Sequence, residues 1–521
     1  MSEGRVIVGG VRAVLPLGLL LAVAVGLGTV LATSHFAGRD PVACGLAVLT
    51  SLATFASAIA ALRLTLGARV PLLAVARVVI AEALRRRGAW VVFGTLLGVV
   101  GLLPLVLGSE QRVDYQVQSF LSYSLSLTTL VLTPWVALFS CESLAGEIAG
   151  RQIHTTLVKP VGRATYLAGK WLGVALLTAA ALAALAVLVI ASARTLARVP
   201  NLEVEQRTRV DEILSARRVI GPTPPTSFDE TVAARLALES QRDPERLQEL
   251  GRDGLEYAIR QDEDRRWRSV DVGATQHYRF RDLAPSGAAC EQVTLQLRFR
   301  ALQSDLTLRL DLRLDGNEHT LVGAVNEVQR VSIPGALVVD GELVLEVTNP
   351  VGLDVDKPAV IFARADGLLI SYPDGGFAGN VLRALTMSWL RLSFLAALAL
   401  CASTFLGFPV ASLATLLVAL AGSAYGLGMA EPEFTAPAAS AAAESGWAEW
   451  IFDRLEQFGL LATRSLSVYG RHDAATEIVS GRRVGEERLV ASALQLGGGI
   501  GVAWLLGTGL LRRRELARVQ V

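Results

Sequence analysis

The stretch WLGVALLTAAALAALAVLVIASA, residues 171–193, decides the fold class of this chain. It contains no charged residue, and it is bounded by Lys170 and Arg194. A helix of about 20 apolar residues crosses the hydrocarbon core of a bilayer, whereas an apolar strand or core helix of a soluble protein is usually shorter. The stretch therefore predicts a transmembrane helix.

Apolar runs of this kind recur along the 521 residues, of which 52% are hydrophobic and 19% are charged. The mean hydropathy is +0.45. The chain is therefore expected to be a polytopic α-helical membrane protein, and its net charge of +1 gives no indication of nucleic-acid binding. We place about eight transmembrane helices, at residues 13–33, 43–62, 89–108, 119–140, 171–193, 385–408, 410–429 and 489–511.

The basic residues of the short loops orient these spans. Arginine and lysine concentrate before residue 13, in the loops 63–88 and 141–170, and after residue 511, whereas the alternate short loops hold only Arg39 and Arg112. Because basic loops stay in the cytoplasm, both termini are expected to be cytoplasmic. The first run is long for a signal peptide and no cleavage site follows it, so a retained helix is expected.

The sixth span carries Arg391 within its apolar run. We favour a helix that begins along the membrane interface, with this arginine snorkelling outward, over a functional charge. The short uncharged turn at Gly407-Phe408-Pro409 predicts a tight inner hairpin between spans six and seven.

This threading leaves a large outer domain over residues 195–378. Its first part, 201–268, is polar and helical in period, with a proline-rich break at 221–227 and a second helix expected to start at Asp243-Pro244.

From about residue 276 to residue 373 the apolar period changes to two, as in LTLRLDLRLDG at 306–316. This period is typical of half-buried strands, and Asp-Gly pairs at 315–316, 340–341 and 366–367 indicate hairpin turns. We expect an antiparallel β-sandwich of jelly-roll type, similar to many accessory glycan-binding modules. Four aromatic residues could stack on a sugar, although positions in the core or at its rim are favoured: Trp267, Tyr278, Phe280 and Tyr372.

A second outer segment, 430–488, begins with a linker rich in alanine, proline and glutamate. The run WAEWIFDRLEQFGLLATRSL follows at 447–466, with Trp447, Trp450 and Phe458 on one apolar face. Tryptophan in such a position favours an interfacial helix, and a helix packed on the outer domain is the alternative.

The segment between the fourth and fifth spans is unusually polar for a connection. It reads CESLAGEIAGRQIHTTLVKPVGRATYLAGKW at 141–171. Ala149, Ile153 and Leu157 follow one another at steps of four, Glu147 and Arg151 form an i,i+4 pair, and proline ends a helix. A short amphipathic helix on the cytoplasmic surface, ended by Pro160, is therefore predicted.

This segment resembles the permease subunits of ABC-2 type ABC transporters. In that family an acidic residue follows the second core helix, and a short helix, a P-V-x-R turn and a G-K pair lead into the third. Glu142 or Glu147 matches the acidic position, Pro160 to Arg163 match the turn, and Gly169-Lys170 match the end. His154-Thr155-Thr156 departs from the usual pattern.

Two further stretches agree with the resemblance. ARVVIAEALRRRGAWVVFG at 76–94 looks like the family's amphipathic helix leading into the first core span, and the C-terminal RRRE resembles a common ending. The resemblance covers about 70–194 and 380–521. It implies a six-helix core (67–194, 379–429 and 489–521), to which two N-terminal helices (1–66), the outer domain and the 430–488 segment are added.

The resemblance implies a function as well as a fold. It identifies the chain as the transmembrane subunit of an exporter in the bacterial inner membrane, working as a homodimer or with a related permease. No G-x-x-x-x-G-K-[ST] motif occurs in the sequence, so ATP and Mg are expected on a separate ATPase subunit and no cofactor or enzymatic activity is expected of this chain. The residues implied in coupling to that subunit are Glu142, Glu147, Arg151, His154, Pro160, Arg163 and Lys170.

Two other classes of function were weighed. A membrane-anchored receptor or scaffold would bind a glycan or protein partner through the periplasmic sandwich and transport nothing. An intramembrane enzyme is disfavoured because the sequence lacks HExxH and GxSxG motifs. Cys290 is the only cysteine of the outer domain, which therefore contains no internal disulfide, and the four cysteines form no metal-binding pattern.

Overall fold

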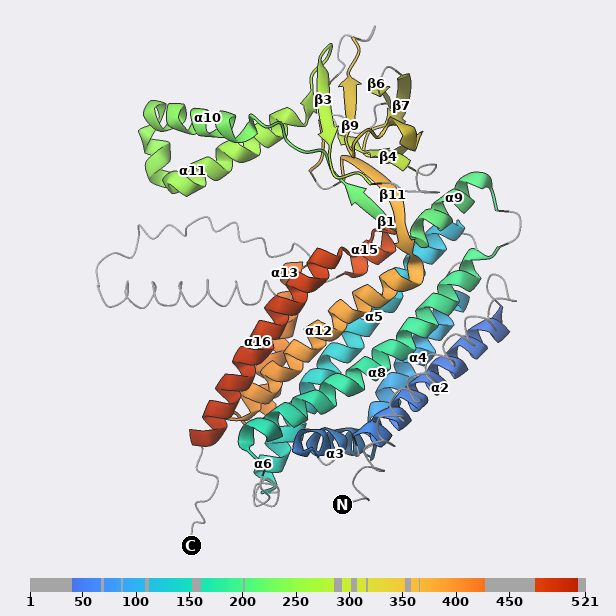
Figure 1. The fold of residues 1–521 in the computed structure, drawn as a ribbon, viewed down its shortest axis with the longest axis vertical. Coiled ribbons are helices and arrows are strands. Elements are labelled where there is room, and N and C mark those ends of the chain that lie inside the picture. The colour runs from blue at the N-terminus through green and yellow to red at the C-terminus, as the bar shows by residue number, and fades with distance from the viewer. Residues whose placement is uncertain are drawn as a thin grey trace. The chain divides into compact units, whose positions relative to one another are not determined.

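The computed structural model describes residues 40–66, 70–85, 88–107, 112–151, 161–199, 202–284, 293–300, 307–314, 317–351, 358–364, 366–426 and 474–513. The chain divides into two compact units (Figure 1). The helical unit comprises the chain up to Leu214 and from Gly376 onward, and the inserted unit is Ser215–Gly375.

The helical unit is a bundle of long apolar helices. Within the described residues, six helices are long and apolar enough to cross a membrane, which confirms a multi-pass membrane protein. They are α2 (Pro41–Thr65), α4 (Gly88–Val106), α5 (Val113–Cys141, continuing to Ala149), α8 (Arg163–Ala197), α12 (Phe377–Ser403) and α16 (Glu486–Arg513). The helix α13 (Phe408–Gly426) is also apolar, but its apolar part, Phe408–Ser423, is shorter than these six helices. The predicted span 13–33 and the tryptophan-rich run at 447–466 lie outside the described residues.

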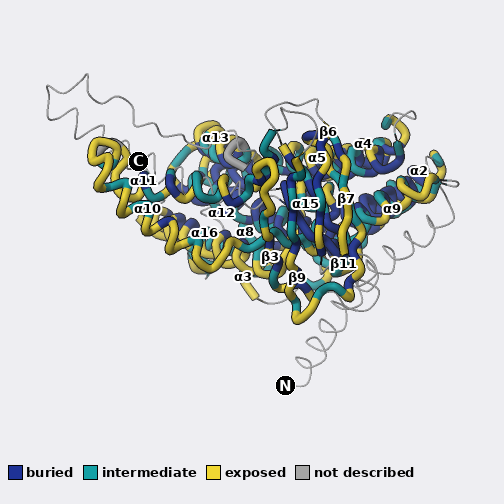
Figure 2. Tube along the Cα trace, turned by 90° about the horizontal axis from the view of Figure 1, so that it is seen from above, coloured by how far each residue is buried: buried dark blue, intermediate teal, exposed yellow. Residues whose placement is uncertain are grey.

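The helix α8 is the centre of this bundle. In its most apolar window 78% of the residues are buried, against 17% in α16, whose exposed stretches are visible in Figure 2. It packs against α2, α4, α5, α12 and α16, and also against α3 (Pro71–Arg85). The stretch that is most apolar in the sequence is thus the one that the other helices surround.

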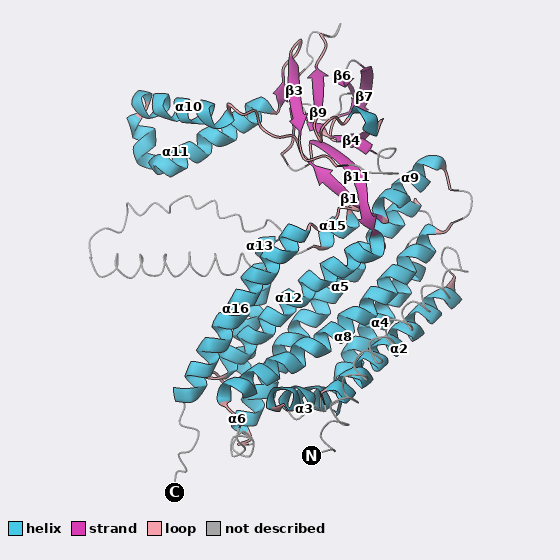
Figure 3. Cartoon of the chain, viewed as in Figure 1, coloured by secondary structure: helices cyan, strands magenta, loops and turns pink. Residues whose placement is uncertain are grey.

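The helix α3 is amphipathic, as predicted, and lies across α8 (Figure 3). Its buried face consists of Ala76, Val79, Ile80, Ala83 and Leu84. The two backbones approach closely at Gly169 and Gly173, where a Cβ atom would lie 2.9 Å from the carbonyl oxygens of Leu72 and Ala76, respectively. Only glycine permits this approach without a shift of α3.

The helix α12 begins at Phe377, eight residues before the predicted span, so Arg391 falls near its middle. Its side chain is only 4% exposed and lies beside hydroxyl residues of α5, among them Thr129 and Thr133. The predicted snorkelling of Arg391 toward the interface is therefore wrong, because the polar face of α5 receives the arginine inside the bundle. The tight connection from α12 to α13 at Thr404–Gly407 agrees with the predicted hairpin.

Two further helices belong to the described part of the helical unit. The helix α9 (Val204–Ile213) packs on α5 and buries Val210 and Ile213 in the bundle core, and α15 (Ala475–Val479) also contacts α5. The inserted unit therefore starts after α9, at β1 (Ser215–Ile220).

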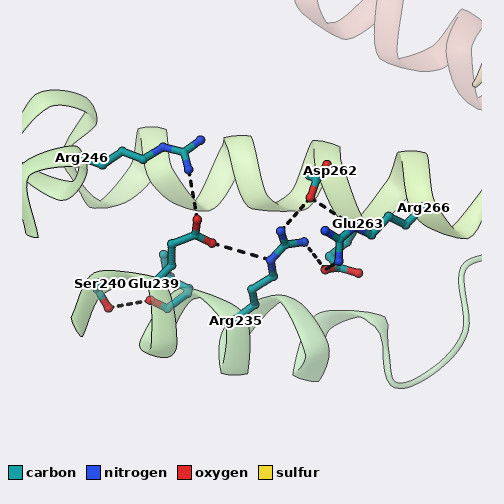
Figure 4. Close-up of polar contacts among 8 residues, drawn as sticks. Arg235, Glu239, Ser240, Arg246, Asp262, Glu263 and Arg266 are labelled. Carbon is teal, nitrogen blue, oxygen red and sulfur yellow. Dashed lines mark hydrogen bonds and ion pairs between the residues drawn. The ribbon is translucent and has the colours of Figure 1, made fainter. Parts of the chain in front are cut away.

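The inserted unit contains a helical hairpin, α10 (Phe228–Arg242) and α11 (Pro244–Trp267). The predicted start at Asp243-Pro244 is confirmed, because the Asp243 side chain accepts a hydrogen bond from the Arg246 amide at 3.1 Å. Arg235 of α10 joins the two helices by ion pairs to Asp262, at 2.8 Å, and to Glu263 (Figure 4). These contacts fix α11 against α10.

The rest of the inserted unit is antiparallel β structure, as the period of two predicted. The strands after β1 are β2 (Ser269–Val270), β3 (Thr275–Phe280), β4 (Val293–Leu297), β5 (Phe299–Arg300), β6 (Thr307–Leu314), β7 (Asn317–Ala324), β8 (Gln329–Ile333), β9 (Leu343–Thr348), β10 (Val360–Phe362) and β11 (Leu368–Gly376). They form sheets in the orders β1-β11-β4-β8, β2-β10-β5 and β3-β9-β6-β7.

One apolar core serves all three sheets. It contains Trp267, Tyr278, Phe280 and Tyr372, which confirms the favoured core positions of these aromatic residues over a role in sugar stacking. Asp340 and Gly341 both have positive φ, at 51° and 77°, as the Asp-Gly hairpin signal predicts.

The strand β1 was not expected within the polar region 201–268. Arg217 in its middle is buried and donates hydrogen bonds to the Ser371 carbonyl and the Thr294 hydroxyl, both at 3.0 Å. A charged residue at a buried position breaks the alternation by which a strand is recognised in a sequence.

The close contact between α3 and α8 leads to the first prediction. We expect Gly173→Ala to lower the free energy of unfolding by about 1–3 kcal/mol through overpacking. Alanine is intrinsically the better helix former by about 1 kcal/mol. A decrease in the free energy of unfolding would therefore indicate a steric clash with α3. The measurement is the midpoint of thermal unfolding in detergent.

Gly98→Ala in α4, where a Cβ meets nothing within 4 Å, is the matched control and should be neutral or stabilising. An unchanged or higher midpoint for Gly173→Ala would show that α3 does not rest on α8.

Candidate functional site

The polar segment after the fourth predicted span begins with a change of helix type. The helix α5 ends at Cys141, a π-helical turn spans Glu142–Gly146, and α6 (Glu147–Ala149) follows. The chain then leaves helical geometry at Gly150 and at Arg151, whose φ is 54°. A continuous helix from Glu147 is therefore wrong at this point, because a left-handed residue interrupts it. Ile153 and Leu157 of the predicted apolar stripe lie outside the described residues.

The break also removes the predicted pairing of Glu147 with Arg151, since the two no longer stand one turn apart on one helix. The Glu147 carboxylate instead lies 2.5 Å from the Lys170 ammonium and accepts a hydrogen bond from the Tyr166 hydroxyl. Two donors from α8 thus hold one acidic side chain of α6.

Lys170 is the cation at the centre of this arrangement, and it is only 1% exposed. Its ammonium donates to the Ser143 carbonyl in the π-turn, at 2.5 Å, as well as to Glu147, and it lies 5.5 Å from the centre of the Tyr166 ring. A π-turn shifts the helical hydrogen-bond register, which alters the carbonyls available to side chains. The buried lysine and the π-turn are therefore parts of one structure, which we call the Lys170 cluster (Ser143, Glu147, Tyr166 and Lys170).

The position of Lys170 corrects the predicted start of the helix that carries the fifth span. Lys170 was placed in a loop before residue 171, but α8 begins at Arg163, so the lysine lies two turns inside the helix. A prediction from hydropathy ends the apolar span before a charged residue such as Lys170. In the folded chain Glu147 neutralises the lysine, so the helix can include it.

Arg163 lies at the start of α8 and contacts a different element. It donates hydrogen bonds to the carbonyls of Leu511 and Arg512 in the last turn of α16, at 2.8 and 2.9 Å. The Trp504 indole of α16 donates to the Ala164 carbonyl at 3.1 Å. A cation at the last carbonyls of a helix satisfies their free acceptors, so the first turn of α8 anchors the end of α16.

Two more residues of the predicted set, Glu142 and Arg151, are among the described residues. Glu142 begins the π-turn and is half-buried, and Arg151 is exposed at the break. His154 and Pro160 lie outside the described residues. Of the two acidic candidates, the structure thus brings Glu147 to the lysine.

Tyr166 and Ser143 are the members of the cluster that the sequence analysis missed. Tyr166 and Lys170 stand at i and i+4 and so share one face of α8. A helix predicted to begin at Arg163 would have placed these two residues together. No sequence pattern marks the Ser143 carbonyl, since it is a backbone group.

Among the described residues, no group of three or more histidine, cysteine, aspartate or glutamate side chains could hold a metal ion. Comparison with protein-family models, with curated proteins and with solved structures finds no match to this chain.

The buried ion pair gives the second prediction. Lys170→Met leaves the Glu147 carboxylate without its cation, so we expect a loss of about 3 kcal/mol in the free energy of unfolding. The double variant Lys170→Met/Glu147→Gln removes both charges and should recover most of this loss. The measurement is a double-mutant cycle by unfolding in detergent, with Arg63→Met at an exposed position of α2 as the control. A double variant that is no more stable than Lys170→Met would contradict the pairing.

Proposed function

We propose that this chain is the permease subunit of an ABC-2 type transporter, an exporter of the bacterial inner membrane. ATP and Mg would bind a separate ATPase subunit, which contacts the connection between α5 and α8. The observation that carries the proposal is the Lys170 cluster, because it joins this connection directly to the central helix of the bundle. A displacement of the connection would act on α8 and, through it, on the helices packed around it.

The end of the bundle at which the cluster lies supports this proposal. The helix α3 contacts α8 near the cluster, at Gly169 and Gly173, and α16 ends beside Arg163. The exposed arginines here are Arg77 and Arg85 of α3, Arg151 after α6, and Arg512 and Arg513 of α16. By the positive-inside rule this end would face the cytoplasm, where an ATPase subunit is available.

The same proposal covers the number of transmembrane helices, the oligomeric state and the location of the inserted unit. The chain would have eight transmembrane helices, with a six-helix core, and would work as a homodimer or beside a related permease. The inserted unit would be a periplasmic β-sandwich of jelly-roll type. Its place in the chain supports a periplasmic location, since it follows α8, which begins at the proposed cytoplasmic end, and precedes α12, which leads back.

Association with the ATPase subunit gives the third prediction. Arg151→Glu reverses an exposed charge without touching the Lys170 cluster, whereas a change at Glu147 would also disturb folding. We expect it to weaken binding of the proposed ATPase subunit by about tenfold, or about 1.4 kcal/mol. The measurement is co-purification and the dissociation constant in detergent or nanodiscs.

Arg218→Glu, at an exposed position of the inserted unit, is the matched control and should leave ATPase binding unchanged. Equal ATPase binding by Arg151→Glu and the unsubstituted chain would contradict the assigned docking segment. Absence of any co-purifying ATPase would contradict the proposed function itself.

The orientation gives the fourth prediction. Cys44, Cys141 and Cys401 are buried, so Cys290 of the inserted unit is a native probe. A membrane-impermeant maleimide added to cells with an opened outer membrane should label the chain, and Cys290→Ser should abolish the labelling. Labelling that appears only after the inner membrane is permeabilised would reverse the proposed orientation.

A further inference from the structure

The inserted unit contains a cavity of about 510 Å³, which we call the hairpin cavity. It is lined by the segment 223–229, by one face of α11, and by the residues that follow β3 and β10. Its volume lies within the range of about 300–1,000 Å³ that is usual for small-molecule sites. The four aromatic residues considered from the sequence do not line it, since they lie in the β core.

The walls of the cavity are held in place before any ligand binds. Thr223 is fixed to β3, because its amide and its hydroxyl both donate to the Arg279 carbonyl at 2.8 Å. Tyr257, Arg260, Gln261 and Asp264 follow the helical spacing i, i+3, i+4 and i+7, so α11 presents them on one side. The ion pairs of Arg235 hold α11 against α10 (Figure 4). A preformed site avoids part of the ordering cost of binding.

The lining holds more guanidinium groups than carboxylates, although each lining arginine has an acidic partner. It contains three arginines and two aspartates, and both aspartates already have guanidinium partners. Asp229 lies 3.0 Å from Arg260, and Asp264 lies 3.1 Å from Arg268, which is outside the lining. The carboxylates inside the cavity are thus neutralised by neighbouring arginines.

The other two lining arginines approach their acidic partners most closely through Nε. Arg281 contacts Glu342 through Nε at 3.1 Å, and Arg364 contacts Asp264 through Nε at 4.0 Å, the limit of a direct pair. Arg364 is 78% exposed. The terminal nitrogens of a guanidinium form the fork that binds carboxylates with two hydrogen bonds. This geometry favours an anionic ligand.

Tyr257 adds a second type of contact. Its side chain is 64% exposed, and its hydroxyl accepts a hydrogen bond from the Gln261 amide at 2.6 Å. An exposed aromatic ring held in one orientation offers an apolar face beside polar groups, which suits the face of a sugar ring. Pro224 and Pro225 line the same cavity and add a stiff apolar surface.

We propose that the hairpin cavity binds an acidic saccharide. A uronic-acid carboxylate is bound by Arg281 and Arg364, and the sugar ring lies against Tyr257. The proposal concerns the inserted unit alone and does not depend on transport or on an ATPase partner.

The test is calorimetric titration of the full-length protein in detergent with three probes. These are α-1,4-digalacturonate, the neutral α-1,4-digalactose, and inorganic phosphate. Digalacturonate should bind, with a dissociation constant that rises about tenfold or more in Arg364→Gln and in Tyr257→Ala, and also with added salt. The neutral disaccharide should bind at least about tenfold more weakly, because it lacks the carboxylate.

Arg309→Gln is the matched control, since Arg309 is an exposed arginine of β6 outside the cavity, and it should leave the dissociation constant unchanged. Arg364 and Tyr257 are largely exposed, so both variants should keep the unfolding midpoint of the unsubstituted chain. Absence of digalacturonate binding, or equal binding by Arg364→Gln and Tyr257→Ala, would overturn the proposal. Phosphate that competes as strongly as digalacturonate would reduce the cavity to an anion site and would overturn the saccharide assignment.

Discussion

The helical unit depends on the accommodation of one buried cation, Lys170, inside its central helix. An unpaired ammonium in an apolar bundle costs several kcal/mol, so the bundle must bring it an anion and acceptors. Glu147 supplies the anion, the π-turn supplies the Ser143 carbonyl, and Tyr166 orients the carboxylate from the other side. The position of α6 relative to α8 follows from this requirement, as does the change of helix type after Cys141.

The same end of α8 is also in close contact with two neighbouring helices. Glycines at positions 169 and 173 let α3 rest on its backbone, and Arg163 and Ala164 hold the last turns of α16. The cluster therefore lies where four elements converge on one helix. This convergence is the physical reason for placing coupling here, since a short connection can move a bundle only if it is rigidly joined to a helix that the others contact.

In the inserted unit the apolar core and the cavity are formed by different elements. Trp267, Tyr278, Phe280 and Tyr372 lie in a shared β core and are not available to stack on a ligand. The cavity arises instead where the helical hairpin meets the loops after β3 and β10, and its polar groups come from four separate parts of the chain. Recognition by this unit would thus depend on the hairpin, whose geometry is set by the ion pairs of Arg235.

The sequence by itself determined the features that depend on local composition and period. Apolar runs placed the long helices, Asp243-Pro244 marked a helix start, and alternation marked the strands. Only the tertiary structure decided the partners of charged residues: Lys170 with Glu147, Arg163 with the end of α16, Arg391 beside the hydroxyls of α5, and Arg217 inside a strand. The physical reason is that a charge can be buried only when distant segments supply its counter-charge or acceptors, and no local pattern records which segments will meet.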